Sequence, residues 1–63
     1  MLQMNNVIQA KVGDIVLVQG IWQDVVDKRY NKNAITHTWC TEYLLRGSEV
    51  YIPDIWIKDK VEK

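Results

Sequence analysis

The sequence predicts an all-β fold, arranged as one small barrel of about five short strands. Hydrophobic residues make up 48% of the 63 positions, which suits a folded core better than a disordered chain. Many of them are β-branched or aromatic, and these residue types favour strands. No long segment shows the helical spacing of apolar residues at i, i+3 and i+4. Turn-forming residues recur at short intervals, and a barrel removes the exposed edges of short strands. We therefore predict a single domain over residues 1–63.

The first half of the chain is predicted to contain short strands separated by turns. Residues 7–10 are predicted as a first strand. The sequence KVGD at 11–14 is predicted as a turn, because its glycine supplies the backbone freedom that a tight turn needs. Residues 15–19 are predicted as a second strand. Gly20 is predicted as a bulge or bend, since a glycine inside a strand pattern often marks one, and residues 21–26 are expected to continue extended.

The second half is predicted to form a hairpin with a loop before it. Residues 27–33 are polar and rich in turn formers, so a loop is expected there. Residues 34–45 are predicted as one long strand, and RGS at 46–48 as a tight turn. Residues 49–52 are expected to pair back on the long strand. Pro53 should end that strand, because proline has no N–H group to donate to a neighbouring strand.

The end of the chain is predicted to add one more strand after a short turn. The turn is placed at residues 53–55 and the last strand at 56–58. Residues 59–63 alternate in charge, so this tail is expected to fray.

Composition and charge argue against several functional classes. Lys and Arg together number 8 and Asp and Glu together number 8, so bulk charge would not drive nucleic-acid binding. One cysteine and one histidine are too few for an internal disulfide or a zinc site. The chain has no recognisable catalytic motif, signal peptide or apolar run of membrane-spanning length. We expect a cytoplasmic protein that is not an enzyme and binds no metal, cofactor or membrane.

Two segments of the sequence resemble SH3 domains. The segment KVGDIVLV at 11–18 is similar to the turn and strand that read Lys-x-Gly-Asp-hydrophobic-x-x-Val in that family. The segment IPDIWI at 52–57 resembles the family's Ile-Pro-Ser-Asn-Tyr-Val ending, with Trp56 in the place of the tyrosine. The family's Ala-Leu-Tyr-Asp-Tyr motif and acidic loop are absent. The likeness is therefore to trimmed SH3-like barrels of the bacterial or phage type.

This resemblance implies a ligand groove walled by aromatic residues. Such walls suit polyproline II segments, which lose little entropy on binding. The resemblance implies a non-enzymatic protein that acts through protein–protein contact, as an adaptor or inhibitor, and that is encoded by a phage or mobile element. The predicted partner-binding surface consists of Trp39, Tyr51, Pro53, Trp56 and, at its edge, Trp22. The competing interpretation is that these residues form a turn and pack against the core.

The sequence does not decide whether the Trp39 side chain lies on a buried or an exposed face of its strand. In one long strand, odd-numbered residues 35–45 would share a face, and hydrophobicity would bury that face. The SH3 resemblance would instead expose Trp39 and turn Cys40 inward. A homo-oligomer would reconcile the two by burying the apolar face against a second subunit. Plasmid-type dihydrofolate reductases are oligomers of this kind, but their Val-Gln-Ile-Tyr segment is replaced here by EVYI at 49–52.

An alternative function is nucleic-acid binding through the polar loop predicted at 27–33. Three cationic side chains there could hold phosphates while a tyrosine stacks on a base. The candidate residues are Lys28, Arg29, Tyr30 and Lys32. A solvated loop without a ligand is the competing interpretation.

Overall fold

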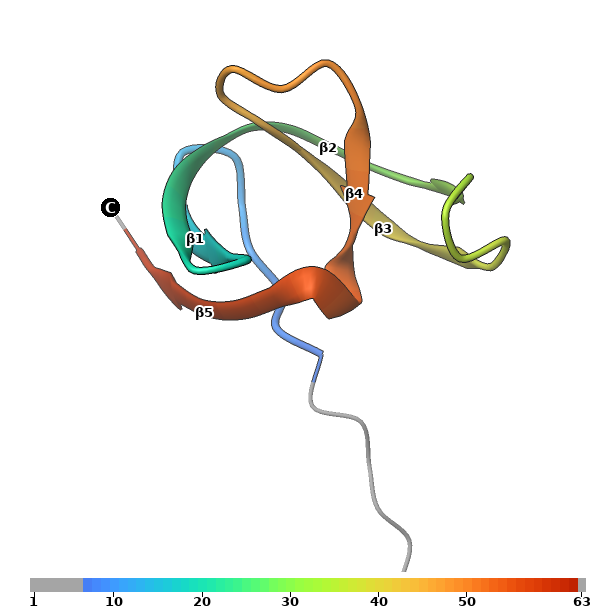
Figure 1. Ribbon diagram of the computed structural model, residues 1–63, viewed down its shortest axis with the longest axis horizontal. Coiled ribbons are helices and arrows are strands. Elements are labelled where there is room, and N and C mark those ends of the chain that lie inside the picture. Colours follow the sequence, from blue (N-terminus) through green and yellow to red (C-terminus); the bar gives the residue numbers. More distant parts are fainter. Residues whose placement is uncertain (1–6, 63) are drawn as a thin grey trace, which may run out of the picture.

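The computed structural model describes residues 7–62 and confirms the all-β prediction. Five strands form one antiparallel sheet in the order β4-β3-β2-β1-β5, and the sheet curls into a small barrel-like fold (Figure 1). A single turn of 3-10 helix, η1, connects β4 to β5. The elements are β1 (Ile15–Val18), β2 (Ile21–Lys32), β3 (Trp39–Leu45), β4 (Tyr51–Pro53), η1 (Asp54–Trp56) and β5 (Ile57–Val61).

The curled sheet is not closed, so its two edge strands remain, contrary to the expectation that a barrel removes them. Strands β4 and β5 stand at the two ends of the strand order and do not pair with each other. Both edges carry features that discourage pairing with another chain. β4 has only 3 residues, and β5 presents the charged residues Lys58, Asp59 and Lys60.

The first half of the chain follows the predicted turns more closely than the predicted strands. Residues 7–10 do not form a strand, and instead the backbone N–H of Ala10 donates to the hydroxyl of Tyr43 at 3.1 Å. The turn at 11–14 is confirmed. The N–H of Asp14 donates to the carbonyl of Lys11 at 2.9 Å, and the Asp14 carboxylate accepts from the Lys11 N–H at 2.9 Å.

The residues Gln19 and Gly20 reverse the chain rather than forming a bulge within an extended segment. Both have positive φ, 53° and 80°, as a two-residue hairpin turn of the primed type requires. They join β1 to β2, with Val18 opposite Ile21. The register shifts lie elsewhere, between Leu17 and Val18 in the β1–β5 pairing and between Val25 and Asp27 in the β2–β3 pairing.

The prediction of a loop at 27–33 and one strand at 34–45 is also wrong. Residues 27–32 belong to β2, and the turn lies at 33–38. Asn33 organises this turn: its side-chain oxygen accepts from the N–H groups of Ile35 and Thr36 at 2.8 and 3.1 Å. The polar strand extends beyond the body of the fold (Figure 1), where solvent reaches most of its side chains and no apolar alternation is needed.

A small core lies inside the curled sheet. Tyr43 is the largest fully buried side chain among the described residues, and every strand contributes at least one buried apolar residue. The end of β4 at Pro53 agrees with the prediction, whereas β5 continues to Val61, past its predicted end at 58. Over residues 7–62 no helix has the length and apolarity needed to cross a membrane. The core residues are Ala10, Val16, Val18, Val25, Tyr43, Leu45, Ile52 and Ile57.

Candidate binding surfaces

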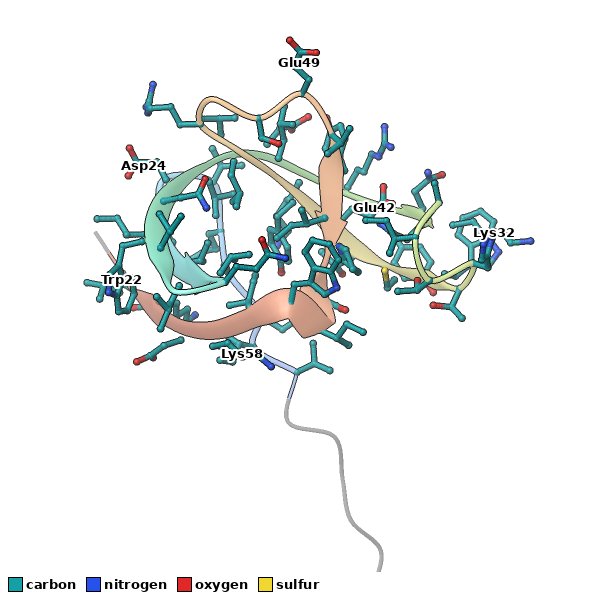
Figure 2. All side chains as sticks on the ribbon, viewed as in Figure 1. Trp22, Asp24, Lys32, Glu42, Glu49 and Lys58 are labelled. Carbon is teal, nitrogen blue, oxygen red and sulfur yellow. The ribbon has the colours of Figure 1, made fainter. Side chains whose placement is uncertain are left out.

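The five residues predicted to bind a partner do not share one groove in the described part of the chain. Pro53 is buried, and Trp56 and Tyr51 are half-buried beside two different hollows. Trp39 is 60% exposed on the β2–β3 hairpin, and Trp22 is 47% exposed near the start of β2. Trp22 lies on the opposite side of the molecule from Lys32, which marks the end of that hairpin (Figure 2).

The first hollow lies where the β1–β2 turn approaches η1. Its volume is about 290 Å³, and it is lined by Gln19, Gly20, Ile55, Trp56 and Lys58. Trp56 packs one side of its indole against the core and leaves part of it facing the hollow. We call this feature the Trp56 hollow.

Pro53 is buried, and it determines the position of Trp56 in the hollow by fixing the conformation of the backbone before η1. Its φ of −73° and ψ of 153° end β4 in an extended conformation, and η1 begins at the next residue, Asp54. The 3-10 turn then closes when the N–H of Ile57 donates to the carbonyl of Asp54. The proline therefore fixes where the chain turns and hence where Trp56 stands.

Trp39 is exposed because its part of the hairpin lies beyond the core. Tyr43 and Leu45 occupy the same face of β3 and are buried, as hydrophobicity predicts. Trp39 instead stacks on Tyr30, with ring centroids 5.8 Å apart and an interplanar angle of 27°. Cys40 is half-buried, and this burial raises the pKa of its thiol.

Strand alternation separates the four residues predicted to bind nucleic acid. Lys28, Tyr30 and Lys32 share the face of the hairpin that carries Trp39, whereas Arg29 lies on the other face, opposite Glu42. The Lys28 ammonium donates to the carbonyl of Ala10 at 3.0 Å. These residues therefore form a strand surface and not the predicted loop.

The opposite face of the hairpin carries a polar cluster centred on Glu42. This side chain is only 2% exposed, and Figure 2 shows it near β4, at the base of the hairpin. One carboxylate oxygen accepts from Arg29 Nε at 2.6 Å, and the other accepts from Asn33 Nδ2 at 2.7 Å. The guanidinium group also stacks on Tyr51, with Cζ 3.8 Å from the ring centroid. The Tyr51 hydroxyl donates in turn to Asp27.

A second hollow, of about 500 Å³, lies beside this polar cluster. Its lining includes two cationic residues, Arg29 and Lys32, and two carboxylates, Glu42 and Glu49, so the net charge of the lining favours neither anions nor cations. The role of Glu42 was not predicted from the sequence. One signal in the sequence could have indicated this role. Glu42 is the one charged residue in a strand of apolar and neutral residues, and a carboxylate that is buried there requires partners.

The Glu42 cluster couples folding stability to pH. Burial alone would raise the pKa of Glu42, but the hydrogen bonds from Arg29 and Asn33 outweigh it and hold the pKa below its ordinary value of 4.5. A lowered pKa stabilises the fold above the ordinary pKa, and this stabilisation is lost as the pH falls through the pKa of the folded protein. We expect the urea midpoint to decline from about pH 5 downward.

The control for this pH dependence is Glu42→Gln, which has no carboxylate to titrate at that position. Urea melts at several pH values should show a shallower acid decline for this variant. The decline should not vanish, because the hydroxyl of Tyr51 also lowers the pKa of Asp27. An equally steep decline in both proteins would contradict the assignment to Glu42.

Among residues 7–62 no three His, Cys, Asp or Glu side chains gather as they would around a metal ion. Comparison of the chain with models of protein families, with curated proteins and with solved structures gave no match.

Proposed function

We propose that the chain is an SH3-like module that works as a non-enzymatic binding protein through protein–protein contact, as an adaptor or inhibitor. Two features support the SH3-like assignment. Pro53 ends β4, and a single 3-10 turn leads into the last strand, as the resemblance of residues 52–57 implies. The strands that flank this turn lie at the two ends of one curled antiparallel sheet.

The Trp56 hollow carries the functional proposal. It combines a partly exposed indole with the exposed side chain of Ile55, so a partner could bury apolar surface on both. Its volume of about 290 Å³ is near the lower end for ligand pockets and suits one or two apolar side chains of a peptide segment. Buried tryptophan contacts are frequent hot spots in protein interfaces. We therefore assign the hollow to an extended, apolar segment of a partner protein.

Peptide selection tests this function directly. Peptides selected from a random library on the wild-type protein should lose affinity about tenfold or more for Trp56→Ala, because that variant removes the wall of the hollow. Binding would be measured by fluorescence anisotropy with labelled peptides. Because the peptides bury mainly apolar surface, the affinity should change little with salt.

Two further variants keep the peptide test decisive. Trp56 also packs on the core, so Ile55→Ser provides a change at an exposed residue of the same hollow and should weaken the same peptides. Trp22→Ala is the matched control, since Trp22 is exposed but does not line the hollow. Selected peptides that bind Trp56→Ala and Ile55→Ser as tightly as wild type would refute the assignment.

A further inference from the structure

We propose that the face of the β2–β3 hairpin that carries Trp39 binds single-stranded nucleic acid by stacking bases on Tyr30 and Trp39. We call this surface the aromatic face and define it by Lys28, Tyr30, Lys32 and Trp39. It shares no residue with the Trp56 hollow, so this site is independent of the peptide-binding function.

The register of the hairpin brings the aromatic face together. Tyr30 pairs with Thr41 and Lys32 pairs with Trp39, so the two rings are diagonal neighbours on one side of the hairpin. They stack on each other and still remain 68% and 60% exposed. Two large rings held together in solvent form a platform on which a base can continue the stack without rearrangement of the protein.

The charges near the platform suit phosphates. Strand alternation places Lys28 and Lys32 on the aromatic face and Asp27 on the other side. Glu42 also belongs to the other side, where it is buried against Arg29. Among the described residues of β2 and β3, the aromatic face therefore carries cations and no carboxylate. Lys32 stands at the end of the hairpin, where Figure 2 shows it pointing away from the body.

Three further carboxylates are engaged by other groups of the protein. Asp24 pairs with Arg46 at 3.0 Å, and Glu62 pairs with Lys60 at 3.3 Å. Asp14 is buried in its own turn. A net charge of zero over the whole chain is therefore compatible with a local cationic surface.

We expect base stacking to contribute more to the affinity than the charges of the lysines do. Base–aromatic stacking supplies most of the affinity and tolerates any base, because every base has a π-face. Single strands lose affinity with a salt slope of roughly −0.7 per phosphate contact. Contacts from Lys28 and Lys32 would give a slope of about −1.4, that is, twice that value. A duplex should bind more weakly, because its bases already stack on one another.

The test uses a fluorescein-labelled oligothymidylate of about 10 nucleotides. Its binding to the full chain would be measured by anisotropy between about 20 and 200 mM salt. Tyr30→Ala and Trp39→Ala should each weaken binding about fivefold or more. Lys32→Ala should lower the steepness of the salt slope by about 0.7.

Arg46→Ala is the matched control, because it removes one positive charge from an exposed residue at the β3–β4 turn. It should leave both affinity and slope close to those of wild type. Tyr30 and Trp39 are exposed, so their variants should keep the wild-type circular dichroism spectrum and urea midpoint.

Three results would overturn the nucleic-acid site. The first is the absence of oligothymidylate binding by wild type at the lowest salt concentration. The second is equal binding of the single strand and of a duplex of the same length. The third is a wild-type protein that sediments as a dimer while the Trp39→Ala variant sediments as a monomer. The aromatic face would then be covered by a second copy of the chain.

Discussion

Replacing Tyr43 with alanine should leave little folded protein. Tyr43 is the largest fully buried side chain of the described residues, and truncation of a large buried aromatic side chain typically costs about 3–5 kcal/mol. A domain of this length has a total stability of roughly 3–9 kcal/mol at the usual values per residue. Urea melts followed by circular dichroism should therefore show a strongly lowered midpoint, or no folded baseline.

Tyr43→Phe separates the packing of the ring from the role of its hydroxyl group. The phenylalanine ring fills the same volume, but the N–H of Ala10 loses its acceptor. The expected cost is about 1–3 kcal/mol, the usual range for an unsatisfied buried group. An alanine variant as stable as the phenylalanine variant would mean that Tyr43 does not fill the core.

Glu42→Ala should have the second largest effect on stability. The substitution removes both hydrogen bonds of the carboxylate and leaves the amide group of the buried residue Asn33 without that acceptor. An unsatisfied buried polar group costs about 1–3 kcal/mol, and Asn33 also organises the β2–β3 turn. We expect a loss of about 2–3 kcal/mol in urea melts, together with faster hydrogen exchange in the hairpin.

Glu42→Gln is the matched variant for this prediction. The glutamine oxygen can still accept one hydrogen bond, so the loss should be clearly smaller than for alanine. If both variants were as stable as wild type, the carboxylate would not be holding Arg29 and Asn33 in place. If Glu42→Gln were as damaging as Glu42→Ala, the charge and not the hydrogen-bonding shape would be the essential property.

The parts of the fold that sequence predicts are those decided by local chemistry. The turn at 11–14 follows from its glycine and aspartate, and the end of β4 follows from the missing N–H of Pro53. The turn at 33–38 was harder to predict. It depends on hydrogen bonds from Ile35 and Thr36 to the side chain of Asn33, in a segment that reads equally well as a strand.

The predicted strand boundaries were wrong where the strand lies outside the core, because burial leaves no apolar pattern in its sequence. Residues 27–32 lie on a hairpin beyond the core, so their polar sequence predicts a loop although they pair as a strand. The register of β2 against β3 also depends on the shift between Val25 and Asp27, which no local pattern marks. The pairing of Glu42 with Arg29 follows from that register, whereas Trp39 is exposed because its part of the hairpin lies beyond the core.

The places of the candidate residues in the fold were predicted in part. Trp56 does border a hollow next to the turn that follows Pro53, as the SH3 resemblance implies, whereas Trp39 and Tyr51 lie elsewhere. The four residues predicted to bind nucleic acid do not share one face, because successive residues of a strand point to opposite faces. A loop would not impose this alternation. Tyr30 and Trp39 meet only because residues 9 apart in the sequence become cross-strand neighbours.

The most direct test of separate indole-bearing surfaces is nuclear magnetic resonance of the 3 tryptophan indole N–H groups, assigned with Trp→Phe variants. A library-selected peptide should shift the Trp56 signal and leave those of Trp22 and Trp39 in place. Oligothymidylate should shift the Trp39 signal alone. A peptide that binds without moving the Trp56 signal, or ligands that move all the indole signals together, would contradict the account.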